Sequence, residues 1–411
     1  MFKERLKKIF DYILAITMVI NCNTIWNYMF INKINTIVLF ITLVIAILIG
    51  FKERFLYEVK FLLMIGFITS YNVIFILFNN GDKVNFVFNF IILFLLFIIY
   101  NFINLNNGNL YLLLFKVVNI IVILAVISVV LYLLCSIFKV INPTSYLKYR
   151  WGENRYIPSY YNIYYETQTI FIHGNEFIRN TGIFTEAPMY SFVLLFALIV
   201  EIFLNTKSKN MFKLMKIVVL ILTIFTTFST TGIVLSLLSL CIFIFKSINK
   251  KNIFKIIVFC LIIIVFLAIS GYFIYSKLLN SSNGSFGSYA ARLGDFKAGI
   301  YAWNNNKIFG VGYKQYQYVQ QYMDLLIRGY GGAGGSSALN MILSEGGIVF
   351  LIFYLLPLVF SFIYSVLRKN FNIFFIFIIF YIALIFTAVP YRYIVIYFLS
   401  IGFIQILMKD N

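Results

Sequence analysis

Residues 275–337 read YSKLLNSSNGSFGSYAARLGDFKAGIYAWNNNKIFGVGYKQYQYVQQYMDLLIRGYGGAGGSS, the longest polar stretch in the chain, between two long apolar runs. Apolar side chains at positions 289, 293, 296, 300 and 303 alternate at spacings of four and three, which places them on one face of a helix. Arg292 and Asp295 lie on another face, three residues apart, where helix side chains meet. The glycines of IFGVGY and GYGGAGG then end the helix and predict a mobile loop. We therefore expect an amphipathic helix at a membrane surface with a mobile loop behind it.

The composition outside this stretch is that of a membrane protein. The 411 residues are 62% hydrophobic and only 11% charged, whereas soluble domains are roughly 45–50% apolar and about 25% charged. The formal net charge is +19, but most basic residues lie in short connectors between apolar runs, which favours membrane topology over nucleic-acid binding. All four cysteines lie in apolar runs, so no disulfide framework is predicted. The sequence thus predicts an all-α integral membrane protein.

The apolar runs predict about twelve membrane-spanning helices, because each span needs roughly 20 mostly apolar residues. The predicted spans are 9–27, 34–51, 59–78, 84–104, 111–140, 185–204, 213–229, 231–248, 253–275, 338–367, 371–388 and 391–408. The run 213–248 is too long for one helix and short for two. Lysines flank both of its ends, which predicts that both ends are cytoplasmic and that the chain turns round at 229–232.

The distribution of Lys and Arg then orients the chain. The positive-inside rule places both termini in the cytoplasm and the two long polar loops, 141–184 and 276–337, outside. No cleavage site follows the first apolar run, so we expect an uncleaved first helix. The chain shows no internal repeat and no soluble domain. We expect residues 1–411 to form a single polytopic domain in a bacterial cytoplasmic membrane.

The outer loops are rich in arginine and aromatic residues but lack the usual enzymatic signatures. His173 is the only histidine, and the carboxylates are scattered along the sequence. A divalent metal site needs clustered oxygens, so we expect chemistry without a metal or other cofactor. A guanidinium fork suits phosphate or diphosphate. The external arginines are Arg150, Arg155, Arg179, Arg292 and Arg328.

Three segments resemble, in this order, parts of the O-antigen polymerase and ligase superfamily. They are RNTGIFTEAP at 179–188, RLGDFKAGIYAW…IFGVGY at 292–313 and SSALNMILSEGGI at 336–348. The resemblance implies a GT-C-like glycosyltransferase that works outside the cytoplasmic membrane without a metal. It implies an undecaprenyl-diphosphate-linked glycan as donor and another such glycan as acceptor, with external arginines holding the diphosphate.

Two departures from the family pattern bear on the activity. The predicted hairpin turn reads STTG where family members often carry an arginine, and Ser336 and Ser337 stand where ligases often carry a histidine. Both departures favour a Wzy-type polymerase of capsule, exopolysaccharide or O-antigen repeat units over a ligase, and they leave the general base unidentified. The partners implied are membrane lipids, a flippase and a chain-length regulator.

The expected site residues come from both loops and from the helices that follow them. The expected catalytic residues are Arg179, Glu186, Arg292 and Glu345, and the expected substrate-binding residues are Arg155, Tyr313, Arg328 and Arg392.

Five of the expected site residues also have a structural alternative. Arg179 and Arg392 are of the kind that anchors a helix at the lipid headgroups. Glu186 suits a helix N-terminus, Arg292 suits a surface pair with Asp295, and Glu345 suits a pair with a loop arginine.

Three other functions stay open at this point. An O-antigen ligase belongs to the same superfamily, whereas a lipid-linked oligosaccharide flippase or other transporter belongs to another class. Transporters usually have short loops and internal repeats, so the two long outer loops count against that class. A membrane subunit without activity is the third alternative, and the concentration of arginine outside counts against it.

Overall fold

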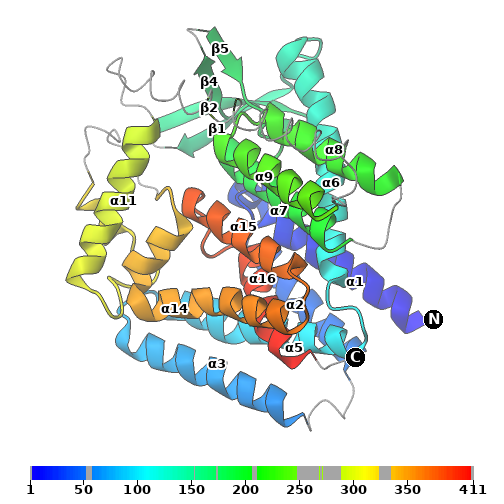
Figure 1. Ribbon diagram of the computed structural model, residues 1–411. Coiled ribbons are helices and arrows are strands. Elements are labelled where there is room, and N and C mark those ends of the chain that lie inside the picture. The colour runs from blue at the N-terminus through cyan, green and yellow to red at the C-terminus, as the bar shows by residue number, and fades with distance from the viewer. Residues whose placement is uncertain are drawn as a thin grey trace.

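The computed structural model describes residues 2–51, 58–151, 153–172, 175–205, 211–247, 288–323 and 335–408, together with Ala268 and Gly271. The described chain is mainly helical (Figure 1). Its helices are α1 (Phe2–Ile20), α2 (Asn32–Gly50), α3 (Val59–Phe78), α4 (Lys83–Phe86), α5 (Phe94–Asn106), α6 (Leu112–Leu131), α7 (Ala187–Phe203), α8 (Met211–Thr226), α9 (Thr230–Ser247), α11 (Ser288–Asn305), α12 (Gln317–Gln320), α14 (Ala338–Leu367), α15 (Asn372–Phe386) and α16 (Tyr393–Ile404). Shorter π-helical segments are η1 (Asn27–Ile31), η3 (Val87–Leu93) and η4 (Tyr132–Ile137), and a 3-10 turn, η5, spans Gln405–Leu407.

The helices follow the predicted spans. A helix lies at each predicted span except 253–275, which falls outside the described residues. The first helix, α1, begins and ends earlier than predicted, at Phe2 and Ile20. The run 213–248 forms two helices, because α8 ends at Thr226 and α9 begins at Thr230. The two predicted helices of this run are therefore confirmed, but the chain turns at 227–229 rather than at the predicted 229–232.

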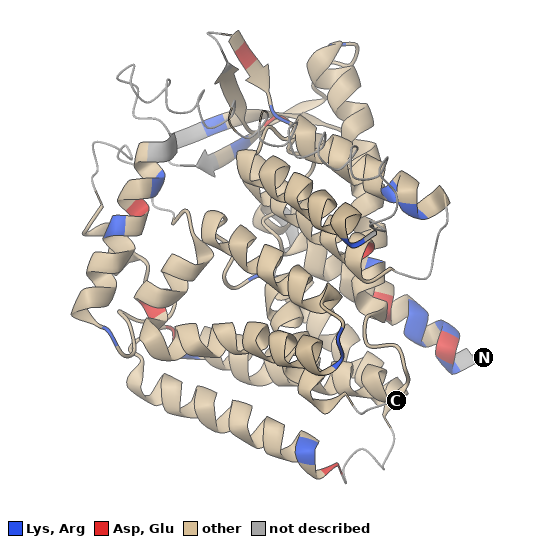
Figure 2. Cartoon of the chain, viewed as in Figure 1, with Lys and Arg blue, Asp and Glu red and all other residues tan. Residues whose placement is uncertain are grey.

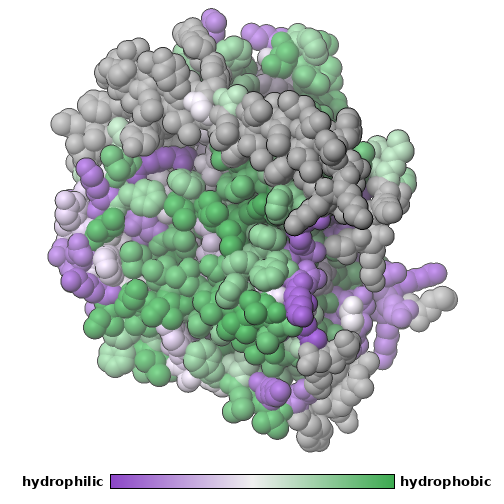
Figure 3. Space-filling view, in the orientation of Figure 1, coloured by the Kyte–Doolittle hydropathy of each residue, from purple (hydrophilic) through white to green (hydrophobic). Residues whose placement is uncertain are grey.

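Several helices have the length and composition of membrane spans. Five described segments are long and apolar enough to cross a membrane: Lys33–Gly50, Val59–Phe78, Lys83–Asn106, Leu112–Ile137 and Ala338–Leu367. Shorter apolar helices cover Ala187–Phe203, Thr230–Lys246, Asn372–Phe386 and Tyr393–Leu407. Figure 3 shows a broad hydrophobic surface in the middle of the molecule, with hydrophilic groups gathered towards its edges. The chain is a multi-pass membrane protein.

Two helices occupy the centre of the bundle. All residues of α16 are buried, and so are all residues of α7 except Pro188. Both helices are almost entirely apolar, with Glu201 of α7 as the one charged residue in either helix, which is the pattern of a helix with neighbours on every side. At the crossing of α14 and α16, a Cβ on Gly402 would lie 2.4 Å from the Cβ of Pro357. The close packing of the bundle therefore fixes the positions of the first residues of α7 and α16.

A buried ion pair joins α1 to α6 inside this bundle. The ammonium of Lys116 lies 3.1 Å from a carboxylate oxygen of Asp11, whose side chain is fully buried. The hydroxyl of Tyr100 donates to the other carboxylate oxygen at 2.8 Å. A charge inside a membrane protein is costly unless it is paired, and here both partners are satisfied.

The first large loop contradicts the all-α expectation. Residues 145–165 form a three-stranded antiparallel sheet, ordered β1 (Ser145–Trp151), β2 (Glu153–Tyr160) and β3 (Tyr164–Tyr165). β4 (Thr169–Ile172) and β5 (Asn175–Ile178) form a separate antiparallel pair. One face of the larger sheet buries Tyr149 and Ile157 against Ile25, while Tyr146 and Tyr156 are exposed. Successive residues of these strands therefore alternate between a buried and an exposed face, which is the period of a β-strand.

The predicted amphipathic helix is α11, and the side that it buries differs from the predicted apolar face. Ala298 and Ala302 of α11 are fully buried, whereas Leu293 and Ile300 are each 44% exposed. Small side chains let a helix approach its neighbour closely, and α11 packs against α14. The predicted apolar face of α11 is thus turned outward from the protein.

The charged residues gather at two sides of the bundle. Figure 2 shows basic residues along the first turns of α1 and at the beginning of α8, on the side where both termini lie. A second group lies on α11, at the opposite side. Both termini therefore lie on the side of the bundle away from α11.

Candidate functional site

Arg179 directly follows β5 and is fixed to the turn of the α8–α9 hairpin. Its main-chain N–H donates to the carbonyl of Gln168 at 3.0 Å. Its side-chain Nε donates to the carbonyl of Thr227 at 2.8 Å. The next residue, Asn180, donates from its main chain to the carbonyl of Thr226 at 3.0 Å. Three separate parts of the chain therefore determine where this guanidinium lies.

Glu186 is the residue before the first turn of α7. Its backbone is extended (φ −145°, ψ 142°), and its side chain accepts no capping hydrogen bond from α7. The main-chain N–H of Ala187 is bound instead by the side chain of Gln168 at 2.9 Å. The same Gln168 oxygen accepts from Arg179 Nη1 at 3.4 Å. Gln168 thus joins Arg179 to the start of α7, and the carboxylate of Glu186 does not serve as a helix cap.

Glu186 is electrostatically coupled to three arginines from different elements. The pKa of Arg179 is lowered to about 10, mainly by burial and also by the positive charge of Arg292, while the carboxylate of Glu186 opposes the shift. Burial also lowers the pKa of Arg292 and of Arg392, and Glu186 opposes the shift in both. We call Arg179, Glu186, Arg292 and Arg392 the arginine cluster. It brings together the end of β5 and the helices α7, α11 and α16, and its positive charges outnumber its carboxylate.

Arg292 and Asp295, which were expected to face each other on α11, have separate partners. Arg292 Nη1 donates to the carbonyl of Phe386, the last residue of α15, at 3.2 Å. A cation is favourable at a helix C-terminus. Asp295 accepts a hydrogen bond from the hydroxyl of Ser336, and Asn340 Nδ2 donates to its carbonyl at 3.0 Å. These contacts orient Arg292 towards α15 and fasten α11 to the beginning of α14.

Arg392 comes directly before α16 and is the third arginine of the cluster. Its Nη1 donates to the carbonyl of Asn21 at 3.4 Å. Asn21 also accepts the main-chain N–H of Tyr393 through its side chain at 2.9 Å. The sequence placed Arg392 near a helix end, where an interface anchor is the common role. The structure instead places it within reach of Glu186.

A second polar group surrounds Glu345, at a break in α14. Gly347 has φ 62° and ψ −166°, which interrupts the helix, and Figure 1 shows the resulting bend. The carbonyls of Ser344 and Glu345 accept from the N–H groups of Val311 and Gly312 at 2.9 and 3.0 Å. The N–H of Ile348 donates to the carbonyl of Lys307 at 2.9 Å. Non-helical backbone is tolerated at membrane depth only where protein or water satisfies it, and residues 307–312 do so here.

The glycines at this contact are required by space. A Cβ on Gly347 would lie 2.2 Å from the carbonyl oxygen of Ile308. A Cβ on Gly310, where φ is +70°, would lie 2.4 Å from the carbonyl carbon of Glu345. The G-x-G of IFGVGY and the GG of SEGGI therefore fit against each other, which explains why both motifs are present.

Asn79 is a positioning residue that the sequence analysis missed. It is fully buried at the end of α3. Its Nδ2 donates to the carbonyls of Phe309 at 2.6 Å and Glu345 at 3.1 Å. Its Oδ1 accepts from the N–H groups of Gly81 at 3.0 Å and Tyr313 at 2.8 Å. The signal available in the sequence was an asparagine at the end of an otherwise apolar span.

The carboxylate of Glu345 is buried and receives two hydrogen bonds on one oxygen. The donors are the hydroxyl of Tyr391 and the main-chain N–H of Lys314, the latter at 3.0 Å. This differs from the expected pairing of Glu345 with a loop arginine. Tyr391 precedes Arg392 in the chain, so the Glu345 group and the arginine cluster are adjacent.

The remaining expected site residues lie elsewhere. The ring of Tyr313 is fully buried, and its hydroxyl accepts from Asn89 Nδ2 at 3.0 Å. This places Tyr313 in the protein core rather than at a substrate-facing surface. Arg155 is exposed on β2, opposite Tyr149 in the register. Arg328 lies outside the described residues.

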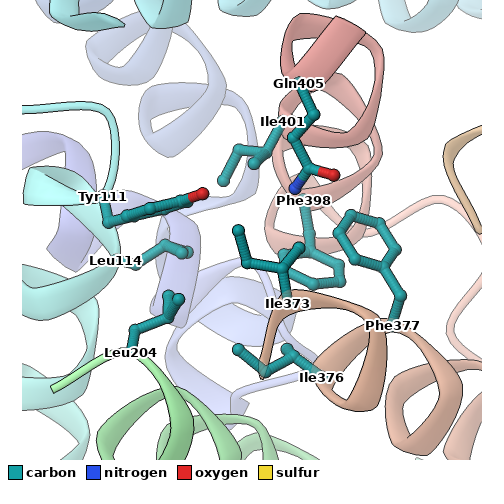
Figure 4. A pocket seen from close by; sticks show the side chains of 9 residues that line it. All are labelled: Tyr111, Leu114, Leu204, Ile373, Ile376, Phe377, Phe398, Ile401 and Gln405. Atoms are coloured by element: carbon teal, nitrogen blue, oxygen red, sulfur yellow. The ribbon is translucent and has the colours of Figure 1, made fainter. Parts of the chain in front are cut away.

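No group of three or more His, Cys, Asp or Glu side chains suited to a metal occurs among the residues that the structure describes. A small cavity, lined mainly by apolar side chains and by Tyr111 and Gln405, lies between α6, α15 and α16 (Figure 4). It contains none of the expected site residues. The polar groups described above, rather than this cavity, are therefore the candidate site.

A comparison with known families matched one part of the chain. Residues 214–334 match the family described as O-antigen ligase. This match supports the predicted resemblance of the chain to the O-antigen polymerase and ligase superfamily. A search of curated proteins gave no match. Members of this superfamily transfer glycosyl groups in polysaccharide biosynthesis. The matched part contains Arg292 and the IFGVGY segment, whereas Arg179, Glu186, Glu345 and Arg392 lie outside it.

Proposed function

We propose that this protein is a polymerase of the O-antigen polymerase and ligase superfamily, which joins undecaprenyl-diphosphate-linked oligosaccharide repeat units into capsule, exopolysaccharide or O-antigen. The observation that carries the proposal is the arginine cluster, in which Glu186 interacts with Arg179, Arg292 and Arg392. A cluster of guanidinium groups beside a single carboxylate is suited to a multiply charged anion such as a diphosphate.

The reaction class follows from the chemistry of such a donor. A hydroxyl oxygen of the acceptor glycan attacks the anomeric carbon of the donor, and the bond from that carbon to the phosphate oxygen breaks. Undecaprenyl diphosphate leaves with the electron pair, and the acceptor hydroxyl loses its proton to a base. Negative charge develops on the leaving diphosphate, so cations fixed in place before the reaction stabilise the transition state more than mobile ones do. Arg179 is fixed by Thr227, and Arg292 by Phe386.

Glu186 has a supporting part in this proposal. Three guanidinium groups close together repel one another, and that repulsion opposes their burial. The Glu186 carboxylate offsets it, since it favours the charged form of each arginine. The charge that remains is positive and available to a donor. A role for Glu186 as partner of the arginines therefore fits better than a role as helix cap.

Polymerase activity is preferred to ligase activity for the two residue differences noted in the sequence. The hairpin turn has no arginine at 229–232 and instead supplies the Thr227 carbonyl to Arg179. Ser336, where ligases often carry a histidine, binds Asp295 of α11. An O-antigen ligase is the second candidate, because the matched family carries that description.

The remaining parts of the proposal follow from topology. The site faces the outside of the bacterial cytoplasmic membrane, both termini lie in the cytoplasm, and the fold is GT-C-like with about twelve spans. The proposed mechanism needs no metal or other cofactor. The proposed partners are membrane lipids, a flippase that delivers the donor and a chain-length regulator, and no nucleic acid.

The test is to delete the gene for this protein and to analyse the surface glycans and the lipid-linked glycans of the mutant cells. A polymerase predicts single repeat units on the carrier and on the final acceptor. Long polymer that accumulates on the carrier alone would indicate a ligase. Absence of any lipid-linked unit from the outer face would indicate a flippase and would overturn the proposal.

A further inference from the structure

Lys314 lies beside both polar groups of the candidate site and has no part in the mechanism above. It directly follows IFGVGY and is exposed, although Gly312 and Tyr313 before it are buried. Its φ is +58°, in the left-handed region. A lysine rarely adopts that conformation, and residues that do so cluster at binding and active sites.

Glu345 holds this conformation in place. Its carboxylate accepts the main-chain N–H of Lys314 at 3.0 Å, and its main-chain carbonyl accepts that of Gly312 at 3.0 Å. The hydroxyl of Tyr391 binds the same carboxylate oxygen. Glu345 is therefore a positioning residue for Lys314, because its buried carboxylate holds the Lys314 backbone in place.

The ammonium of Lys314 has charges of both signs around it. Burial lowers the pKa of Lys314, Asp82 raises it, Arg392 lowers it and Glu345 raises it. Its Nζ also lies 5.7 Å from the centre of the Tyr313 ring. The effect of Arg392 shows that Lys314 and the arginine cluster share one electrostatic environment.

Asp82 does not account for the placement of this lysine. The carboxylate of Asp82 already accepts the N–H of Asn85 at 3.0 Å and its side-chain amide at 2.5 Å, as the cap of α4. Those two hydrogen bonds stabilise the carboxylate without any lysine. The left-handed backbone and the buried Glu345 beneath it would be a costly arrangement for a surface ion pair, which contributes little to stability.

We propose that Lys314 binds a second anionic group of the glycan donor, next to the group held by the arginine cluster. The inference rests on the proposed function. Its ligand chemistry is a phosphoryl or carboxylate oxygen, because an ammonium is a compact point charge that serves either. The source is the second phosphate of the donor diphosphate or the carboxylate of an acidic sugar in the repeat unit.

The experiment measures binding to the purified full-length protein in lipid nanodiscs. The probes are farnesyl diphosphate and a trigalacturonate, and maltotriose is the uncharged comparison. The variants are Lys314→Gln, Lys297→Gln as an exposed lysine of α11 that loses the same charge, and Arg292→Gln. Lys314→Gly is a second test variant, because glycine suits φ +58° and removes the charge without strain. Thermal unfolding of each variant verifies folding.

We expect both Lys314 variants to bind one charged probe about tenfold more weakly than wild type, and Lys297→Gln to bind it normally. Weakened binding of farnesyl diphosphate identifies the phosphate, and weakened binding of trigalacturonate identifies the sugar carboxylate. Unchanged binding of both probes by Lys314→Gly, while Arg292→Gln loses farnesyl diphosphate, would overturn the role of Lys314 and leave the proposed function standing. Unchanged binding of farnesyl diphosphate by Arg292→Gln, or no binding by wild type, would overturn both.

Discussion

Arg179 donates a hydrogen bond from Nε to the carbonyl oxygen of Thr227 at 2.8 Å, so an arginine of the first large loop is fixed to the turn of the α8–α9 hairpin. The hairpin turn thereby determines the direction of a guanidinium whose residue lies 48 positions earlier. The turn itself contains no arginine. It contributes instead a main-chain carbonyl that accepts a hydrogen bond from Arg179.

The first prediction concerns Arg179→Lys. A lysine cannot keep the Nε contact to Thr227 and at the same time present a planar fork to a phosphate. We expect normal protein levels and a rate of polymerisation lower by on the order of a hundredfold, since the loss of such a transition-state contact costs roughly 3 kcal/mol. The measurement is polymer length on a gel, with protein quantified by immunoblot. Arg292→Lys should behave in the same way, and long polymer from both variants would exclude the arginine clamp.

The second prediction separates Arg392 from an ordinary interface anchor. An anchoring arginine tolerates lysine, because either side chain reaches the headgroups. Arg392 interacts with Glu186 and donates to Asn21, so we expect Arg392→Lys to shorten the polymer. Arg368→Lys is the matched control, since Arg368 ends α14 and binds Met408 at 3.0 Å, away from the cluster. Equal polymer from the two variants would return Arg392 to the anchoring role.

A third prediction concerns the break in α14. Gly347→Ala adds a methyl group 2.2 Å from the carbonyl oxygen of Ile308 at a φ of +62°. We expect a loss of at least about 1–3 kcal/mol of stability from the backbone strain alone. Gly294→Ala is the control, because nothing lies within 4 Å of its added Cβ, and alanine favours a helix by roughly 0.8–1 kcal/mol. Thermal unfolding in detergent should show a lower midpoint for Gly347→Ala only.

The fourth prediction concerns orientation in the membrane. Single cysteines at Asn162 and Asn306, in the two large loops, should react with an impermeant maleimide added to intact spheroplasts. Cysteines at Asn109 and Asn370, in the connectors after α5 and α14, should react only after permeabilisation. The connector at Asn370 is basic and is expected in the cytoplasm, and the alternation of the predicted spans places the connector at Asn109 on the same side. Labelling of Asn162 and Asn306 under opposite conditions would place the two loops on different sides and exclude a shared site.

The fifth prediction concerns metal removal. The carboxylates of the predicted outer loops are scattered in sequence, and the proposed mechanism stabilises the leaving diphosphate with arginines. We expect purified protein to extend lipid-linked repeat units in the presence of EDTA at an unchanged rate. Loss of extension on chelation, restored by magnesium or manganese, would contradict the metal-independent mechanism.

The helical part of the fold was predictable because an apolar run of the right length has few alternatives in a membrane. The sheet at 145–165 was predictable in principle. Its residues alternate, with Leu147 and Tyr149 on one side and Tyr146 and Lys148 on the other, which is the period of a half-buried strand. That signal is short, and it lies in a segment that was assigned as a loop because it is polar. The bend in α14 also left a signal, namely Gly346 and Gly347 within an apolar run.

The candidate site was predictable only in its parts. Arg179, Glu186 and Arg292 were identified from motifs, and the structure brings them together. Arg392 was expected to bind substrate, but its electrostatic interaction with Glu186 depends on the tertiary structure, as does the hydrogen bond between Lys314 and Glu345, and no local pattern reports either of them. Tyr313 was expected to bind substrate, whereas its ring is buried among other aromatic side chains.

The break at Gly347 also has a consequence for biosynthesis. Its polar partners are Asn79 and residues 307–312, and all of them precede it in the chain. When Gly347 leaves the ribosome, every group that its backbone requires has already been synthesised. The interrupted helix therefore never has to wait in lipid for a later segment, and only α15 and α16 remain to be added around it. A break placed later in the chain would still be synthesised after its polar partners. If residues 307–312 followed the break in the chain, the interrupted helix would be synthesised before them.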